Sequence, residues 1–203
     1  GGYDLPQNHS FTLNSIAETF NEFVGLHAIT YRTAMLREMG YRQTEGCPYM
    51  DTEWFIIPMS RVRSVRYFNE VVTCYLVGRD GQTMQPEIFR RDFPIVIRLI
   101  SAIVGQWKEL SSKASLTSQV YAQALLEQKI VWLDRYCLLE KPTKTLNEAL
   151  VDFDLRIKDI APESFVKLLE VCTPSRKFSL RYIALWRKAY STRSPLFKLY
   201  YAY

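Results

Sequence analysis

The spacing of apolar residues changes character near residue 85. From residue 86 onward, apolar side chains recur every three or four positions, the spacing of one face of an α-helix. Pro94 lies inside the first such stripe and is expected to kink or split the helix, because proline lacks the amide donor that a helix interior uses. The stripe contains Phe89, Phe93, Ile97, Ile100, Val104 and Trp107.

Four further helices are predicted downstream. One face of a second long helix is marked by Tyr121, Leu125, Trp132 and Tyr136. A capping box, Thr145-x-x-Glu148, opens the third helix. Pro162 opens the fourth at a first-turn position, and the pair Thr173-Pro174 repeats that start signal for the fifth. The region after residue 86 is therefore predicted to be helical throughout.

Shorter and more mixed patterns precede this region. Residues 11–23 predict a short helix, and residues 28–31 predict a short strand. Residues 33–39 predict a helix that ends at Gly40, because glycine adopts the left-handed conformation that commonly stops helices. This part of the chain therefore alternates between element types within short distances.

A further helix and a β-hairpin are predicted before the change of pattern. Asp51 is expected to be the N-cap of a helix over residues 52–59. Residues 64–68 and 71–77 are β-prone runs, and the Asn69-Glu70 pair between them suits a hairpin turn.

The patterns together predict a mainly α protein of the α+β class. A small mixed segment with a β-hairpin is followed by a helical bundle. Residues 1–84 and 85–203 are the two predicted domains, and the glycine-containing loop over residues 78–86 is the predicted linker.

Composition narrows the classes of partner. The 203 residues are 48% hydrophobic and 23% charged, which is typical of a globular protein, and no apolar run approaches the ~18 residues of a membrane span. A net charge of +5 permits an anionic partner, but the basic residues interleave with acidic ones, so nucleic acid is not an expected partner. Four scattered cysteines predict reduced thiols and a cytoplasmic location.

Residues 45–54 contain the densest group of chemistry-bearing side chains. Asp51 at a loop-to-helix junction is suited to accept a proton from a substrate hydroxyl, and Trp54 one turn later is suited to stack on a sugar. The plainer alternative is that Asp51 only caps the helix and Trp54 only packs in the core. Residue type and spacing alone favour this alternative.

Longer motifs in the same region carry a family resemblance. They resemble the family 2 glycosyltransferases of GT-A fold, most of all those that build bacterial capsular and other surface polysaccharides, over about residues 20–90. The motifs are the run His27-Ala28-Ile29-Thr30-Tyr31-Arg32-Thr33-Ala34-Met35-Leu36, then Glu45-Gly46-x-x-Tyr49-x-Asp51-x-Glu53-Trp54-x-x-x-Pro58, then Tyr75-Leu76-x-Gly78-Arg79-Asp80-Gly81-Gln82-Thr83-Met84.

The resemblance implies an inverting transfer of sugar from a nucleotide-sugar to a saccharide or lipid-linked acceptor. Asp51 matches the family's general base, although Met50 stands where the family often has a glutamate. The other implied substrate-binding residues flank the acceptor or approach the diphosphate. They are Glu45, Trp54, Arg79, Gln82 and Thr83.

The donor-binding half of such enzymes has no recognisable counterpart here. That half holds Mg²⁺ or Mn²⁺ on an Asp-x-Asp motif that follows an apolar strand. The sole Asp-x-Asp triplet here, Asp152-Phe153-Asp154, lies in a predicted helix with Phe153 in the core, so its carboxylates are expected to be surface charges. The chain is therefore interpreted as a C-terminal portion that is inactive alone and holds no metal, and Gly1 is interpreted as a tag remnant.

Two further expectations concern partners. The aromatic tail over residues 195–203 suits peripheral contact with the inner face of the cytoplasmic membrane, or packing against the bundle. The alternative to an enzyme is a non-catalytic helical module that binds a partner protein or forms a homodimer.

Overall fold

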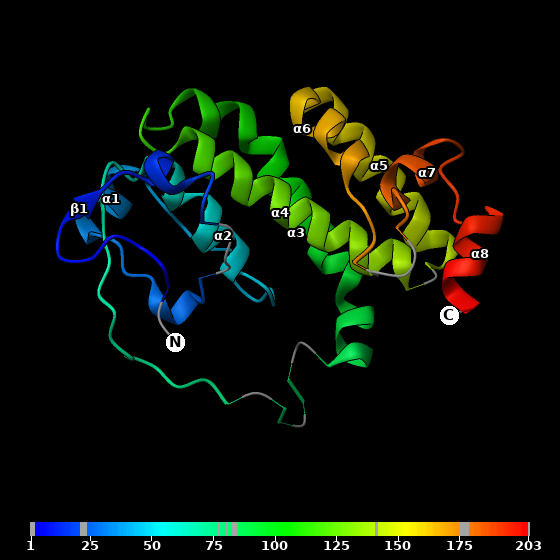
Figure 1. Cartoon of the computed structure of the whole chain (residues 1–203), viewed down its shortest axis with the longest axis horizontal. Helices are drawn as coiled ribbons and strands as arrows, with labels where there is room; N and C mark the ends of the chain where they lie inside the picture. The colour runs from blue at the N-terminus through cyan, green and yellow to red at the C-terminus, as the bar shows by residue number, and fades with distance from the viewer. Residues whose placement is uncertain are drawn as a thin grey trace. The chain divides into compact units, whose positions relative to one another are not determined.

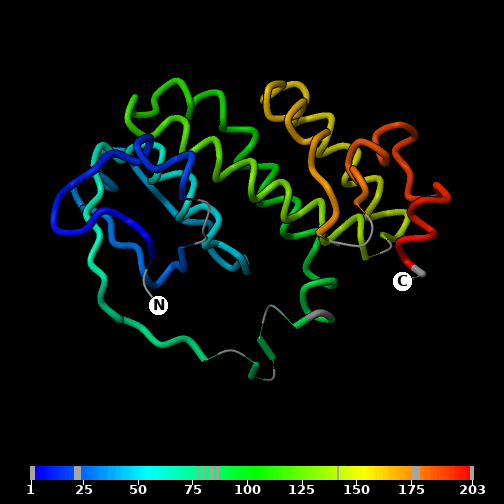
Figure 2. The backbone as a smooth tube through the Cα atoms, in the orientation of Figure 1, coloured from blue at the N-terminus to red at the C-terminus, as the bar shows by residue number. Residues whose placement is uncertain are grey.

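The computed structural model describes residues 3–20, 24–76, 78, 79, 81, 82, 85–140, 142–174 and 179–202. It is mainly helical, and Figures 1 and 2 show the succession of helices that follows residue 85. The chain forms two compact units. Unit 1 comprises Gly1–Ile88 and Glu109–Leu126, and unit 2 comprises Phe89–Lys108 and Glu127–Tyr203.

Unit 1 begins with short elements. A two-stranded antiparallel ladder pairs β1 with β2, with Ser10 opposite Arg66 and Phe11 opposite Val65. The elements before residue 85 are β1 (Ser10–Phe11), the 3₁₀ helices η1 (Leu13–Ile16) and η2 (Leu26–Ala28), α1 (Thr33–Glu38), α2 (Asp51–Ile56), the 3₁₀ helix η3 (Pro58–Arg61) and β2 (Val65–Arg66).

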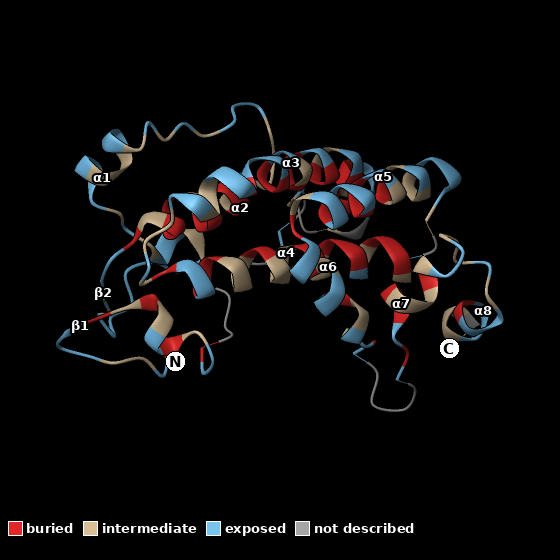
Figure 3. Ribbon diagram, turned by 90° about the horizontal axis from the view of Figure 1, so that it is seen from above, coloured by how far each residue is buried: buried red, intermediate tan, exposed pale blue. Residues whose placement is uncertain are grey.

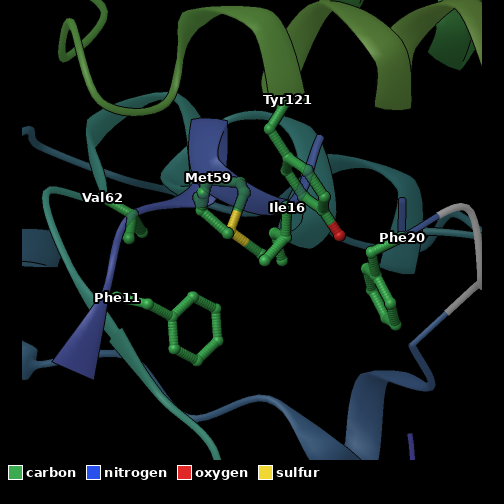
Figure 4. Close-up of a cluster of buried hydrophobic side chains, with 7 residues drawn as sticks. Phe11, Ile16, Phe20, Met59, Val62 and Tyr121 are labelled. Atoms are coloured by element: carbon green, nitrogen blue, oxygen red, sulfur yellow. The ribbon is translucent and has the colours of Figure 1, made fainter. Parts of the chain in front are cut away.

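The core of unit 1 joins these elements to the start of α4. Tyr121 stacks on Phe20 with ring centroids 6.4 Å apart, and Ser118 Oγ donates to the Ser60 carbonyl over 2.8 Å. Such a buried hydroxyl contact fixes the segment because an unpaired polar group there would be costly. Figure 4 shows the cluster, whose buried members are Phe11, Leu13, Ile16, Phe20, Met59, Val62 and Tyr121.

Unit 2 is built from helices. Those that contribute to it are α3 (Pro86–Ser112), α4 (Gln119–Leu139), α5 (Lys144–Ile160), α6 (Pro162–Lys167), the 3₁₀ helix η4 (Leu168–Glu170), α7 (Tyr182–Arg187) and α8 (Pro195–Ala202). Figure 3 shows buried and exposed residues alternating along α5 as an amphipathic helix requires. Fully buried side chains include Ile130, Leu133, Leu150, Phe153, Trp186 and Phe197.

The predicted fold class is confirmed: the protein is mainly α with a small antiparallel β element. The predicted position of that element is partly wrong. Residues 65 and 66 form a strand, but their partner is β1, and residues 71–76 form no strand. Val77, the last residue of the predicted hairpin, lies outside the described residues.

Some of the other local predictions for unit 1 are confirmed and others are wrong. The helix over residues 33–39 and its stop at Gly40, whose φ is +62°, are confirmed. The helix predicted over residues 11–23 is mostly wrong: Phe11 belongs to β1, and only η1 follows it, capped by Thr12, which accepts from the Ser15 amide. Residues 21–23 lie outside the described residues. The strand predicted over residues 28–31 is wrong, since η2 ends at Ala28 and no ladder follows.

The helix predictions of unit 2 hold, with shifted starts. Pro94 lies within α3 without ending it. Thr143, and not Thr145, caps α5, because Thr143 Oγ1 accepts from the Leu146 amide over 3.2 Å. The helix predicted from Thr173-Pro174 instead begins at Tyr182, and residues 175–178 lie outside the description.

Two further predictions concern membrane spans and the boundary between the domains. Within the described residues, no helix is long and apolar enough to cross a membrane. The domain boundary between residues 84 and 85 stays a prediction. Unit 1 also takes in Glu109–Leu126, a stretch that the prediction had assigned to the second domain.

Candidate functional site

The loop before α2 determines how Asp51 is presented. Gly46 and Tyr49 both have positive φ, at +66° and +67°, so the chain turns sharply twice before the helix. Met50 is the N-cap residue and supplies no side-chain cap, so the prediction that Asp51 caps the helix is wrong. Asp51 is instead the first helical residue, where a carboxylate is favoured by the helix dipole. Within the described part of the chain, its carboxylate accepts no hydrogen bond and forms no ion pair.

Trp54 lies one helical turn after Asp51 and is held by two tyrosines. The rings of Tyr31 and Trp54 meet edge to face with centroids 4.8 Å apart, and Tyr41 approaches the same indole at 5.8 Å. Tyr31 Oη also donates to the Trp54 carbonyl over 2.9 Å. Among the described residues, neither the buried Trp54 Nε1 nor the buried Tyr41 hydroxyl has a hydrogen-bond partner.

Glu53, also on α2, supports this arrangement through the preceding loop. Its buried carboxylate accepts from the Thr44 amide over 2.8 Å and from the Thr44 hydroxyl over 2.6 Å. These two bonds tie the preceding loop to the helix. Burial, with the negative charge of Glu53 as a second cause, raises the pKa of Tyr41 to about 12. Sequence reasoning gave Glu53 no role, because its partner lies in a loop that no local pattern connects to it.

Three of the other predicted substrate-binding residues, Glu45, Arg79 and Gln82, lie in loops. Glu45 and Arg79 are exposed. Gln82 closes its own turn, since its Oε1 accepts from the Gly78 amide over 2.7 Å and its Nε2 donates to the Leu76 carbonyl over 2.7 Å. Thr83 lies outside the described residues.

Ring contacts connect the stretches that carry the family resemblance. His27 stacks on Tyr75 with centroids 5.5 Å apart, and the Tyr31–Trp54 contact joins the first stretch to the second. All these residues belong to unit 1. No described contact brings Arg79 to Asp51 or Trp54.

A second polar centre, in unit 2, was not predicted. Asp154 is almost completely buried and is paired with Arg187, whose Nη2 donates to Oδ1 over 2.6 Å and whose Nε lies 3.0 Å from both carboxylate oxygens. Tyr190 Oη donates to Oδ2 over 3.2 Å. The guanidinium also lies 3.6 Å from the centroid of the Phe165 ring. The expectation that Asp154 is a surface charge is therefore wrong, whereas Asp152 is exposed.

Asp134 adds a second carboxyl group to this centre. Its side chain is buried, and Oδ2 has no partner among the described residues. Burial and the nearby charge of Asp154 raise the pKa of Asp134 from 3.8 to about 8, against the opposing effect of Arg187. Burial likewise raises the pKa of Cys137, so its thiol is a poor nucleophile.

A sequence signal for this centre exists. Asp154 is in phase with Leu150, Phe153 and Ile157, which form the buried stripe of α5. A carboxylate in phase with an apolar stripe is predicted to be buried and paired. The Asp152–Asp154 triplet does not fit a metal site, because Arg187 occupies both oxygens of Asp154. Within the described part, no group of three or more potential ligands gathers.

Comparisons with models of known protein families, with curated proteins and with solved structures give no match. The functional assignment of α2 therefore depends on the sequence motifs and on the geometry described above.

Proposed function

We propose that this chain is the acceptor-side and helical C-terminal part of an inverting family 2 glycosyltransferase of cell-surface polysaccharide synthesis. The observation that carries the proposal is the placement of Asp51 and Trp54 on consecutive turns of α2. Residues three apart on a helix share a face, so a carboxylate without a partner lies beside an aromatic ring. One saccharide can meet both groups.

The proposed step is a direct displacement. The acceptor hydroxyl oxygen forms a bond to the anomeric carbon of the nucleotide-sugar while the bond from that carbon to the diphosphate oxygen breaks. The hydroxyl proton passes to the Asp51 carboxylate, which acts as general base. A single inversion at the anomeric carbon follows from this single displacement.

Trp54 has the features of a sugar-binding platform. An indole offers a broad apolar face to the apolar side of a pyranose ring. Edge-to-face contacts with Tyr31 and Tyr41 fix the indole plane, and the Tyr31 hydrogen bond to the Trp54 carbonyl fixes the turn that carries it. An acceptor stacked there is oriented before its hydroxyl reaches Asp51.

The donor and its metal belong to another part of the proposed enzyme. The nucleotide-sugar and an Mg²⁺ or Mn²⁺ ion on its diphosphate are assigned to the family's donor-binding half, since the Asp-x-Asp triplet here does not fit them. The proposed location is the cytoplasm, at the inner face of the cytoplasmic membrane, where a lipid-linked acceptor is reached. Exposed Leu196 and Leu199 on α8, with the exposed Lys198 between them, support peripheral contact.

The test is Asp51→Asn in the protein that carries both halves. We expect kcat for sugar transfer to fall by about 10²–10⁴-fold, because a positioned base contributes that much, while donor affinity stays the same. The melting temperature should hardly change, since the carboxylate has no partner to lose.

The matched control is Glu87→Gln, which removes one exposed carboxylate from the first turn of α3. It should leave transfer unchanged. Wild-type turnover in the Asp51→Asn protein would remove Asp51 from the mechanism and would favour the alternative of a non-catalytic interaction module.

A further inference from the structure

Residues 71–76 leave large apolar side chains in water. Val71, Val72, Tyr75 and Leu76 are between 61% and 85% exposed. Figure 2 shows this stretch as tube without helical coil, and within the described part no backbone-to-backbone hydrogen bond involves residues 71–76. A contiguous exposed apolar stretch of this kind marks an interaction site.

The sequence of the stretch is that of a strand buried on both faces. Val71, Thr73 and Tyr75 alternate with Val72, Cys74 and Leu76, and no charged residue lies between Glu70 and Arg79. A strand with one face in water alternates apolar and polar residues, whereas near-continuous apolar runs occur in central strands of sheets covered on both faces.

The stretch is tied to the body of unit 1 at its start and ends in a local turn. Before it, Tyr67 forms a β-bridge with Gln7 and its hydroxyl accepts from the Tyr3 amide over 2.8 Å. After it, Gln82 Nε2 holds the Leu76 carbonyl. The stretch is thus a segment without backbone pairing, which runs from an anchored start to a local turn.

We propose that residues 71–76 insert as a strand into a β-sheet whose other strands lie outside the residues described here. The required partner is an open sheet edge with apolar layers on both faces. A second copy of the chain does not meet this requirement, because two paired strands make a ribbon that covers neither face and is marginally stable. The identity of the sheet as that of the donor-binding half rests on the proposed function.

Amide hydrogen exchange compares the 203-residue chain with the protein that carries both halves. In the chain alone, the amides of residues 71–76 should exchange at the rate of unstructured peptide. In the larger protein they should exchange at least about tenfold more slowly, because a paired strand opens rarely.

Cysteine labelling gives an independent readout in the same two proteins. Cys74 and Cys172 are both exposed, and Cys172 belongs to unit 2. Iodoacetamide should modify Cys74 at least about tenfold more slowly in the larger protein. Cys172 serves as the internal control and should react equally in both.

A proline variant tests the backbone pairing directly. Thr73→Pro removes an amide that donates no bond in this structure, so the 203-residue chain should keep its melting temperature. In the larger protein the same variant should abolish the protection of Cys74. The conservative Thr73→Ser variant should retain it.

The outcomes separate this inference from the proposed function. Equal exchange and equal Cys74 labelling in the two proteins would overturn the inserted strand, even if Asp51→Asn abolishes transfer. Protection that appears in the chain alone and is lost on dilution would identify a second copy as the partner and would also overturn it. If Cys74 is protected but the Asp51→Asn protein transfers sugar at the full rate, the inserted strand is supported and Asp51 is not the general base.

Discussion

Unit 2 buries an ion pair in its core, whereas unit 1 leaves its candidate base half-exposed. In unit 2 the Asp154–Arg187 pair satisfies its hydrogen bonds inside the bundle. In unit 1 Asp51 has no partner in the described part, and two neighbouring aromatic residues carry unpaired polar atoms. The Asp154 and Arg187 charges therefore stabilise the fold, whereas the Asp51 charge is available to a ligand.

The two acidic motifs also differ from what their sequences indicate. Asp152-Phe153-Asp154 has the spacing of a metal-binding triplet, but its inner carboxylate is committed to Arg187. Asp51 has no such commitment, although it looks like an ordinary helix-capping residue in the sequence. Availability, and not residue type, therefore distinguishes the candidate base from the structural acid.

The largest expected stability effect comes from breaking the buried pair. Arg187→Met should lower the free energy of unfolding by about 3–5 kcal/mol, because it leaves the Asp154 carboxylate buried without a counter-charge. Urea unfolding followed by circular dichroism measures the change.

Arg181→Met is the matched control for that experiment. Arg181 pairs with Glu170 at the surface, where the two side chains are 61% and 69% exposed. Exposed pairs contribute about 0–1 kcal/mol, so this variant should be nearly neutral. Equal effects of the two variants would contradict the structural role assigned to Asp154 and Arg187.

Replacing Asp134 by a neutral residue is expected to raise the free energy of unfolding, by less than Arg187→Met lowers it. The pKa of its buried carboxyl group rises from 3.8 to about 8, so the folded state binds a proton that the unfolded state releases. Stability should therefore fall as pH rises from about 4 to about 8 and level off above that.

Asp134→Asn removes this titration. At pH 8 the variant should be more stable than the wild type by roughly 1–3 kcal/mol, the usual cost of an unsatisfied buried polar group. The advantage should shrink as the pH falls and vanish below pH 3.8, where the wild-type carboxyl is protonated in both states. A wild-type stability curve that is flat from pH 4 to 8 would contradict the prediction.

The sequence predicted what depends on local repetition. The courses of α3, α4, α5 and α6 follow from apolar spacing because a helix buries residues close in sequence. The β1–β2 ladder was missed because its strands are far apart in the chain, and no local pattern selects Ser10–Phe11 as the partner of Val65–Arg66. The start of α5 was misplaced because two threonines near it are both able to cap.

The candidate site shows the same limit. The joint placement of Asp51 and Trp54 follows from their spacing on one helix. The bonds from Thr44 to Glu53 and the approach of Tyr41 to Trp54 depend on how a loop folds back, which spacing does not specify. Asp154 was misassigned although its phase with Leu150 and Ile157 marks a buried position.

The smallest stability effect is expected at Trp54, where function and packing separate most cleanly. Trp54→Phe keeps an aromatic ring against Tyr31 and removes the unpaired Nε1 donor, so the free energy of unfolding should change by less than about 1 kcal/mol. If the indole stacks on the acceptor, KM for the acceptor should rise about two- to tenfold while kcat changes little, because the lost face contributes to binding and not to proton transfer. Tyr41→Phe is the matched control, since it removes the other unpaired polar atom of the cluster and leaves the indole in place. Initial rates at varied acceptor concentration, measured beside urea unfolding for both variants, distinguish acceptor binding from packing as the role of Trp54. An unchanged KM in the Trp54→Phe protein would show that the indole only packs, and the acceptor would then have no stacking surface beside Asp51.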